Sequence, residues 1–264
     1  MAGHKAVFLQ AISSVISLNT EGPLNLTRQF FSVALIKSIS GIRGTIGGVP
    51  GDNLSPLDVV KFTAAYGSIL LENNKTATVV IGRDGRISGA MVRDLVVSTL
   101  CGLGIHVIDL GLSTTPTVEL AVSSENASGG IILTASHNPR EWNALKLLNE
   151  KGEFISAEMG ARVLELAEAS KFQFASVDKL GTVQSADYLQ KHIDAILAYP
   201  LMNKEAIVSR KFKIIVDAVN STGAIFVPAL LKALGVENVI VLNEEVNGRF
   251  AHNPEPLPEH LNQL

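Results

Sequence analysis

A serine hydroxyl stands where the chain is forced to turn. It belongs to the run Thr134-Ala135-Ser136-His137-Asn138-Pro139, which follows a short apolar strand expected at 130–133. Pro139 biases the residue before it away from helical dihedrals, so the turn has a fixed place. Exposed backbone N–H groups in such a turn can hold phosphate oxygens. The run therefore permits phosphate chemistry at Ser136, although a polar turn in which the hydroxyl only caps backbone groups is the more frequent case.

Other side chains could complete a phosphate site. His137 and Lys146 add positive charge or proton-transfer capacity. Arg43 lies in a glycine-rich stretch at 40–48, and its planar guanidinium can donate paired hydrogen bonds to a phosphate. This stretch matches neither a Walker loop nor a dinucleotide fingerprint, so by itself it is more simply interpreted as a flexible turn.

A polar loop at 82–86 also follows an expected strand. Its Arg83 and Asp84 could orient an active-site loop. They could also form a partly exposed ion pair, which is the commoner arrangement and contributes little to stability.

The composition limits what the protein can bind. The chain has 264 residues, of which 47% are apolar and 18% charged, and a net charge of −3. No basic field is available for a nucleic-acid backbone, so no nucleic-acid partner is expected. No stretch is long and apolar enough to span a bilayer, so no membrane partner is expected either. Cys101 is the only cysteine, which suits a reducing compartment, and we expect a cytoplasmic location.

Apolar runs and helical periodicity alternate from residue 34 onward. Ser55 followed by Pro56 predicts a helix start, and Asp58 completes a capping-box-like spacing. The expected strands are 77–81, 105–110, 130–133, 145–148, 213–216 and 239–242, and the expected helices are 57–71, 88–102, 116–124, 156–169, 186–198 and 222–234. This alternation indicates parallel β-α-β units, in which ligands gather at the carboxyl ends of the strands.

The fold class predicted is α/β, with two consecutive domains that each have a mixed or parallel sheet and helices on both faces. We expect an unstructured N-terminal extension at 1–33, a first domain at 34–184 and an incomplete second domain at 185–264. The second unit echoes the first in its strand, its loop and its small helix-capping residues. The chain stops where a helix would begin after Pro258, so the second domain is expected to be truncated.

The motifs, in this order, resemble those of the phosphohexomutases, the α-D-phosphohexomutase superfamily that includes phosphoglucomutase, phosphomannomutase and phosphoglucosamine mutase. The run 134–139 matches that family's phosphoserine motif without a substitution, and Asn143 and Lys146 match the asparagine and lysine after it. Further similar motifs lie at 41–44, 82–89 and 253–261. Two departures are small: Ser40 stands where many members have an acidic residue, and Ala144 replaces a glycine. They leave the transfer chemistry intact but obscure the subfamily.

The resemblance implies an isomerase that interconverts hexose 1-phosphate and hexose 6-phosphate through a phosphoserine and a bisphosphorylated sugar. The implied catalytic residues are Ser136, His137, Lys146 and Arg43, and the implied substrate- and phosphate-binding residues are Arg43, Arg83, Asn143 and Lys146. Arg43 and Lys146 would neutralise the transferring group and assist proton transfer. His137 would share that task or only support the loop.

Mg²⁺ is the implied cofactor, because a phosphoserine carries about −1.5 to −2 charges at neutral pH and Mg²⁺ prefers oxygen and phosphate ligands. A phosphate oxygen on Ser136 would be one metal ligand, and the family's three metal-binding aspartates would lie beyond Leu264. The implied partners are a hexose phosphate and the bisphosphate intermediate. The identity of the hexose and the oligomeric state stay open. Without the metal loop and later domains we expect the isolated chain to be inactive. The alternative is a non-catalytic fragment that binds a sugar phosphate or pairs with another subunit.

Overall fold

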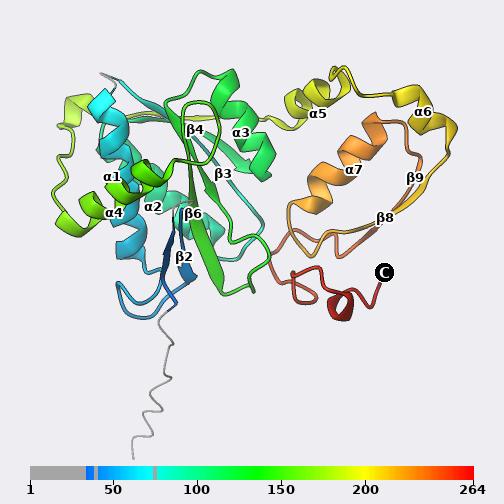
Figure 1. Cartoon of the computed structure of the whole chain (residues 1–264), viewed down its shortest axis with the longest axis horizontal. Helices are drawn as coiled ribbons and strands as arrows, with labels where there is room; N and C mark the ends of the chain where they lie inside the picture. The colour runs from blue at the N-terminus through cyan, green and yellow to red at the C-terminus, as the bar shows by residue number, and fades with distance from the viewer. Residues whose placement is uncertain (1–33, 39–40, 74–75) are drawn as a thin grey trace, which may run out of the picture. The chain divides into compact units, whose positions relative to one another are not determined.

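The computed structural model describes residues 34–38, 41–73 and 76–264 (Figure 1). The extension expected at 1–33 and the departure at Ser40 lie outside the described residues.

Seven strands form one mixed sheet in the order β1-β2-β6-β5-β3-β4-β7. Their bounds are β1 (Ile36–Ser38), β2 (Gly41–Thr45), β3 (Thr78–Arg83), β4 (His106–Leu112), β5 (Gly129–Leu133), β6 (Trp142–Leu148) and β7 (Val183–Ser185). β3 runs parallel to β4 and β5, and β4 runs parallel to β7. β6 is antiparallel to β5 and to β2. The predicted α/β class with a mixed sheet is confirmed.

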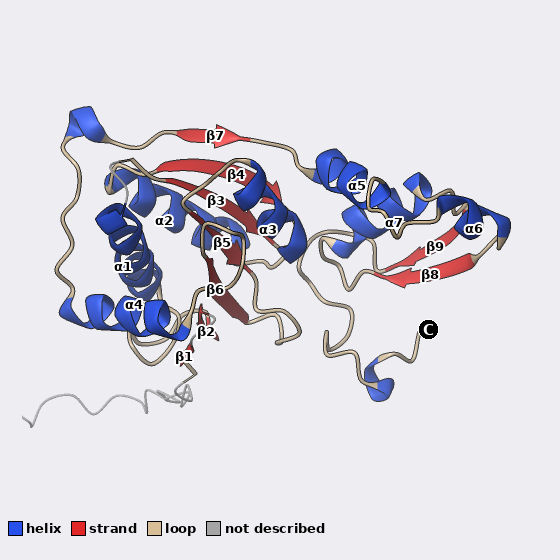
Figure 2. Ribbon diagram, turned by 45° about the horizontal axis from the view of Figure 1, so that its top comes forward, coloured by secondary structure: helices blue, strands red, loops and turns tan. Residues whose placement is uncertain are grey.

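Helices cover both faces of this sheet, as Figures 1 and 2 show. The helices are α1 (Pro56–Asn73), α2 (Gly89–Gly102), α3 (Thr115–Ser124) and α4 (Ala157–Ala169). Val79 and Ile81 of β3 belong to a buried cluster with residues of α1, α2 and α4. Val80, between them, belongs to a second cluster with residues of α3. Successive strand residues point to opposite faces, so this one apolar strand serves both layers.

Two helix starts that the sequence predicts are confirmed. Asp58 accepts a hydrogen bond from the Ser55 backbone N–H at 3.1 Å, and the Ser55 hydroxyl accepts one from the Asp58 N–H at 3.4 Å. The Ser156 hydroxyl accepts from the Met159 N–H at 3.2 Å at the start of α4. Such caps satisfy N–H groups that have no partner inside the helix.

Tyr66 joins α1 to the junction of β5 and β6. Its ring is fully buried, and its hydroxyl lies 2.7 Å from the Leu148 carbonyl oxygen and 3.3 Å from that of Gly130. A Cβ on Gly129 would lie only 2.1 Å from the Tyr66 hydroxyl oxygen, so glycine there makes room for the phenol. Burial raises the pKa of Tyr66, which therefore stays protonated and donates its hydrogen bond.

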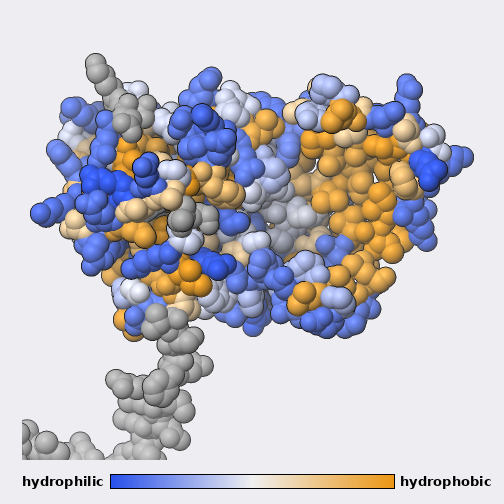
Figure 3. Space-filling view, viewed as in Figure 1, coloured by the Kyte–Doolittle hydropathy of each residue, from blue (hydrophilic) through white to orange (hydrophobic). Residues whose placement is uncertain are grey.

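The remainder of the chain forms a parallel β-α-β unit. It begins with two helices, α5 (Leu189–Leu197) and α6 (Lys204–Ser209). The strands β8 (Lys213–Asp217) and β9 (Asn238–Leu242) then pair in parallel, and α7 (Gly223–Ala233) connects them. β3, α2 and β4 follow the same parallel pattern, as the internal echo in the sequence predicts. In Figure 3 a broad hydrophobic area lies over α7, β8 and β9, where Val227, Ile215 and Ile240 are exposed.

The domain limits proposed from the sequence stay a prediction, and the boundary between 184 and 185 falls within β7. None of the helices in the described ranges is long and apolar enough to cross a membrane.

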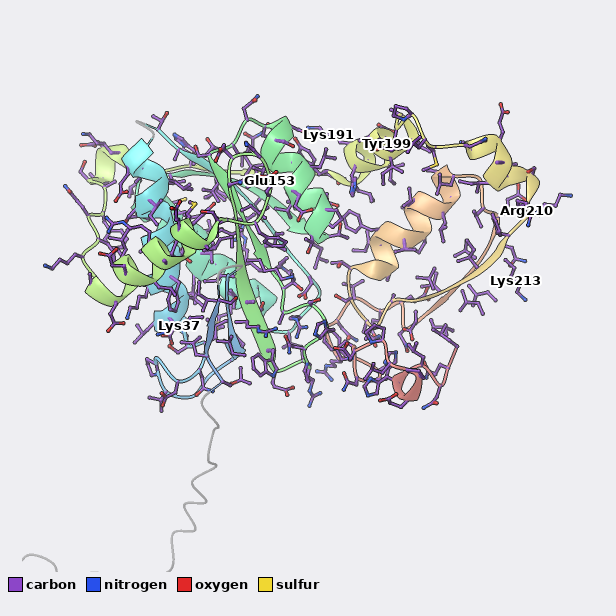
Figure 4. All side chains as sticks on the ribbon, viewed as in Figure 1. Lys37, Glu153, Lys191, Tyr199, Arg210 and Lys213 are labelled. Atoms are coloured by element: carbon purple, nitrogen blue, oxygen red, sulfur yellow. The ribbon has the colours of Figure 1, made fainter. Side chains whose placement is uncertain are left out.

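Replacing Tyr66 with Phe should lower the free energy of unfolding by about 1–3 kcal/mol, the cost of leaving a buried hydrogen-bonding group without its partner. Urea denaturation of the purified chain measures this. Tyr199→Phe is the matched control, because Tyr199 is exposed (labelled in Figure 4) and should show no change. Equal stability of the two variants would contradict the role given to Tyr66.

Candidate active site

A hollow of about 370 Å³ lies beside β2, β6 and the loop after β5. Its lining residues are Ser38, Gly41, Arg43, Thr134, Ala135, Ser136, His137, Asn138, Ala144 and Lys146. The structure therefore brings together all four residues predicted to be catalytic. The other two predicted phosphate-binding residues, Arg83 and Asn143, are not among the residues that line it.

The pairing register of β2 and β6 sets the positions of the two cations. Gly41 lies opposite Lys146, and Arg43 lies opposite Ala144, so both long side chains stand on the same face with a small residue facing each. A Cβ on Gly41 would lie 2.1 Å from the Leu145 carbonyl oxygen, so this position requires glycine. Ala144, the departure from the family pattern, is still small enough to leave the Arg43 side chain free to enter the hollow.

Burial acts on the charge of Lys146. It lowers the pKa of this half-buried ammonium, while Glu119 and Asp84 oppose the shift and Arg43 adds to it by repulsion. Burial also raises the pKa of Glu119, which Lys146 opposes. Two neighbouring cations in a partly desolvated hollow favour an anion between them.

Ser136 sits at the tip of the loop with an exposed side chain and a left-handed backbone, φ +55°. Non-glycine residues adopt this conformation rarely, so the surroundings must hold it. The Ser136 N–H donates to the Thr134 hydroxyl oxygen at 3.0 Å, and that hydroxyl donates to Asp84 Oδ2 at 2.6 Å. This relay from Asp84 fixes the backbone from which the Ser136 hydroxyl projects.

Arg86 holds the rest of the loop. Its side chain is fully buried, and its terminal nitrogens donate to the carbonyl oxygens of Ser136 (2.8 Å), Asn138 (2.8 Å), Pro139 (2.7 Å) and Trp142 (2.9 Å). Its Nε donates to Asp84 Oδ2 at 3.0 Å. All five guanidinium protons are used, because the planar donor fork matches a curved row of carbonyls. The loop after β5 is therefore folded around one side chain from the loop after β3.

This arrangement decides an alternative that the sequence leaves open. Asp84 pairs with Arg86, whereas the Arg83 side chain donates to the Asp84 backbone carbonyl at 3.1 Å. Arg83 also lies close to α2, since a Cβ on Gly89 would meet its guanidinium at 3.2 Å. The sequence offered Asp84 as a residue that could orient the loop, but it gave no such role to Arg86 or Thr134. The sequence pattern that could have indicated this network is Arg86, an arginine two residues after Asp84. The partners of Arg86 are mostly backbone carbonyl groups, which leave no pattern in the sequence.

Asn143 is fully buried behind the hollow. Its amide nitrogen donates to the Ser88 hydroxyl at 2.9 Å, and its amide oxygen accepts from the Ala144 N–H at 2.8 Å. These contacts tie β6 to the start of α2. A phosphate-binding role for Asn143 or Arg83 stays a prediction.

The carboxylates near Ser136 are already engaged. Asp84 accepts from Arg86 and Thr134, and Glu255 lies 3.2 Å from His137 Nε2. In the described parts of the chain, no group of three or more His, Cys, Asp or Glu side chains could hold a metal ion. Ser136 is thus one potential oxygen ligand in a donor set that these residues do not complete.

Changing Arg86 to Lys should lower the free energy of unfolding by about 3–5 kcal/mol, as expected when a buried charged network is broken. Lysine keeps the charge but has only three donors for five acceptor contacts. Urea denaturation measures the loss, and hydrogen exchange should rise in residues 135–142. Arg162→Lys, at an exposed position of α4, is the control and should leave both unchanged. Similar behaviour of the two variants would contradict the role of Arg86.

Comparisons with known proteins agree with these features. Residues 35–174 match the family model for phosphoglucomutase/phosphomannomutase, alpha/beta/alpha domain I, and residues 190–264 match the model for domain II. A phosphoglucomutase/phosphomannomutase from Thermococcus kodakarensis is 37% identical over 83% of this chain and 48% of its own length. A phosphoglucosamine mutase from Methanococcus aeolicus is 33% identical over 81% of this chain and 45% of its own length.

A solved structure has the same fold. The crystal structure of a protein assigned as a phosphomannomutase from Thermus thermophilus superimposes with a TM-score of 0.76 at 27% identity, and covers 88% of this chain and 51% of that one. The chain thus spans about half the length of the relatives it matches. Because the domain I model alone matches more than half of its residues, the chain belongs to the phosphoglucomutase/phosphomannomutase family.

Proposed function

We propose that this chain forms the phosphoryl-carrying part of a phosphohexomutase, in which Ser136 gives a phosphoryl group to a hexose phosphate and takes one back. The observation that carries the proposal is the placement of an exposed hydroxyl, held in a strained left-handed turn, beside two cations in one hollow. Membership of the family and the names of its relatives support the choice of hexose phosphates as substrates.

The proposed step breaks the bond between Ser136 Oγ and phosphorus and forms one between a sugar oxygen and phosphorus. The sugar hydroxyl loses its proton and the departing Ser136 Oγ gains one, which regenerates the serine hydroxyl. The bisphosphorylated sugar then returns its other phosphoryl group to Ser136 in the reverse sense. Such transfers depend mainly on positioning and on charge neutralisation. In this scheme Arg86 and Asp84 hold the loop, and Ser136 acts as the carrier.

Arg43 and Lys146 supply the charge neutralisation. Arg43 can donate two parallel hydrogen bonds to the phosphoryl oxygens. Lys146 approaches as a point charge whose burial makes it a readier proton donor than an exposed lysine. His137, which lines the same hollow, is placed to assist one of them or to support the loop.

Mg²⁺ is the proposed cofactor, and its chemistry would be to neutralise the phosphoryl oxygens. The Ser136 phosphoryl group would provide one ligand. Because the carboxylates near Ser136 are engaged elsewhere, the remaining ligands must come from outside the residues described around the hollow.

A second candidate function follows from the extent of the chain relative to its family. It spans 48% of the Thermococcus relative, and its described residues form no metal-binding cluster. By itself the chain could therefore bind a hexose phosphate, or pair with another subunit, without completing the isomerisation. We expect the isolated chain to convert no hexose 1-phosphate to hexose 6-phosphate. A cytoplasmic location also stays a prediction.

Incubation of the purified chain with a hexose 1,6-bisphosphate and Mg²⁺ should place one phosphoryl group on Ser136. Phosphopeptide mapping by mass spectrometry locates it. Ser136→Ala should abolish the label, whereas Ser209→Ala, an exposed serine at the end of α6, should leave it unchanged. A label that survives Ser136→Ala would refute the proposed carrier. Binding of hexose phosphate without any label on Ser136 would favour the second candidate function.

The rate of this transfer should fall as the pH rises. The fall should begin at a lower pH than the titration of an ordinary lysine would give. The pKa of Lys146 is lowered by burial, so its positive charge is lost at a lower pH than in an exposed lysine. Lys146→Arg should remove this alkaline fall, since arginine stays charged up to about pH 12. Lys213→Arg, at an exposed position labelled in Figure 4, is the control and should reproduce the original profile. An unchanged alkaline fall in Lys146→Arg would assign the titration to another group.

A further inference from the structure

One segment connects the β8–β9 unit with the proposed active-site loop. Residues 248–256, here called the strap, run past both Arg86 and His137. The Phe250 ring centroid lies 5.1 Å from the Arg86 guanidinium carbon, and Glu255 Oε2 lies 3.2 Å from His137 Nε2. At Gly248 the approach is closest, because a Cβ there would lie 2.3 Å from the Gly85 carbonyl oxygen.

A partly buried ion pair fastens the middle of the strap. His252 Nε2 lies 2.7 Å from Asp217 Oδ2 at the end of β8, and His252 Nδ1 lies 2.8 Å from the Asn253 carbonyl oxygen. A carboxylate and a carbonyl can only accept hydrogen bonds, so both ring nitrogens must donate, and the ring is an imidazolium. The side chains are little exposed, at 17% for His252 and 6% for Asp217.

The partners of Asp217 support this assignment. Its Oδ1 accepts from the Asn243 amide at 2.9 Å and from the Val219 N–H at 3.1 Å. Burial alone would raise the pKa of Asp217, but the hydrogen bonds from Asn243, His252 and Val219 together lower it. The hydrogen bond to the Asn253 carbonyl and the pairing with Asp217 raise the pKa of His252 against the effect of burial. Asp217 is the ionisable group that faces the ring.

We propose that Glu255 is a positioning residue for His137, delivered to the phosphoryl-carrying loop by a strap that the charged His252–Asp217 pair anchors. His137 and Glu255 are both well exposed, and a free surface pair of this kind contributes little because ordering two mobile side chains costs entropy. The His252–Asp217 pair lowers this entropic cost. It fixes the backbone of Glu255, so that the carboxylate is already placed when His137 turns toward it.

Anchoring depends on pH in a defined direction. A histidine whose pKa is raised by folding stabilises the fold fully below its unfolded value of about 6.5 and loses that contribution as pH rises through the folded value. The strap should therefore loosen on the alkaline side. Asp217, with a lowered pKa, stays charged through the same range.

The anchor is tested by hydrogen exchange of residues 248–256 in the full chain, a measurement that does not depend on the proposed function. Protection factors, which remove the ordinary rise of amide exchange with pH, should be high in the strap at pH 6 and should fall as the pH rises. Asp217→Asn and His252→Gln should both give fast exchange in the strap at every pH, with the sheet of β1 to β7 still protected. The ¹⁵N spectrum of histidine-labelled chain should show both His252 ring nitrogens protonated at pH 6. A neutral His252 ring, or a strap equally protected in Asp217→Asn, would overturn the anchor.

The positioning role is tested with Glu255→Gln and with Glu259→Gln, an exposed glutamate just beyond the strap, as its matched control. The His137 ring signals should shift in the first variant and not in the second. Unshifted signals would overturn the proposal. The link to phosphoryl transfer rests on the proposed function, and there Glu255→Gln should slow transfer to Ser136 about threefold to tenfold through kcat more than KM. Shifted His137 signals with an unchanged transfer rate would overturn the positioning role. Absence of transfer in the unmodified chain would refute the proposed function. In that case hydrogen exchange still tests the anchor, and the His137 spectrum still tests the contact with Glu255.

Discussion

Arg86 is a full positive charge inside the protein, and the loop that carries Ser136 takes its described form because that charge must be satisfied. An arginine with 1% of its surface exposed is tolerated only when each guanidinium proton has an acceptor. Three of those acceptors are carbonyls of the loop that carries Ser136, a fourth is the Trp142 carbonyl at the start of β6, and the fifth contact is Asp84. Asp84 also fixes Thr134, which receives the Ser136 N–H. One buried ion pair thus sets both the path of the loop and the left-handed backbone at its tip.

The pairing register of the sheet positions the two cations of the candidate site, Arg43 and Lys146. β6 lies between β5 and β2, so the strand that carries Lys146 pairs on one side with the strand leading to Ser136 and on the other with the strand carrying Arg43. Gly41 and Ala144 are the small residues that face the two cations. A slip of one residue between β2 and β6 would put Arg43 and Lys146 on opposite faces of the sheet, one of them in the apolar layer with α1, α2 and α4. The register of β2 and β6 is therefore a requirement of the proposed chemistry.

The two β-α-β units contact each other at the loop after β3, which also holds Arg86. The Gly85 N–H donates to the Ser221 hydroxyl at 3.0 Å, next to the buried guanidinium, and Phe250 covers that guanidinium from the strap. The loop after β3, which holds the loop that carries Ser136, is thus also a loop that the second unit contacts. Such contacts connect the conformation of the β8–β9 unit to the backbone that carries Ser136.

The sequence by itself determined the α/β class and the helix starts at Ser55 and Ser156, because apolar periodicity and caps are local properties. The phosphate-handling residues that the family resemblance implies stay predictions. The sequence could not separate a polar turn from a phosphoryl carrier at Ser136 without the resemblance to a family. Only the tertiary structure decided that Asp84 pairs with Arg86, that Asn143 is buried, and that Glu255 reaches His137. These contacts depend on backbone carbonyl groups and on residues that are far apart in the chain. Such groups meet only when the strands have taken their register. Neither kind of partner leaves a local pattern in the sequence.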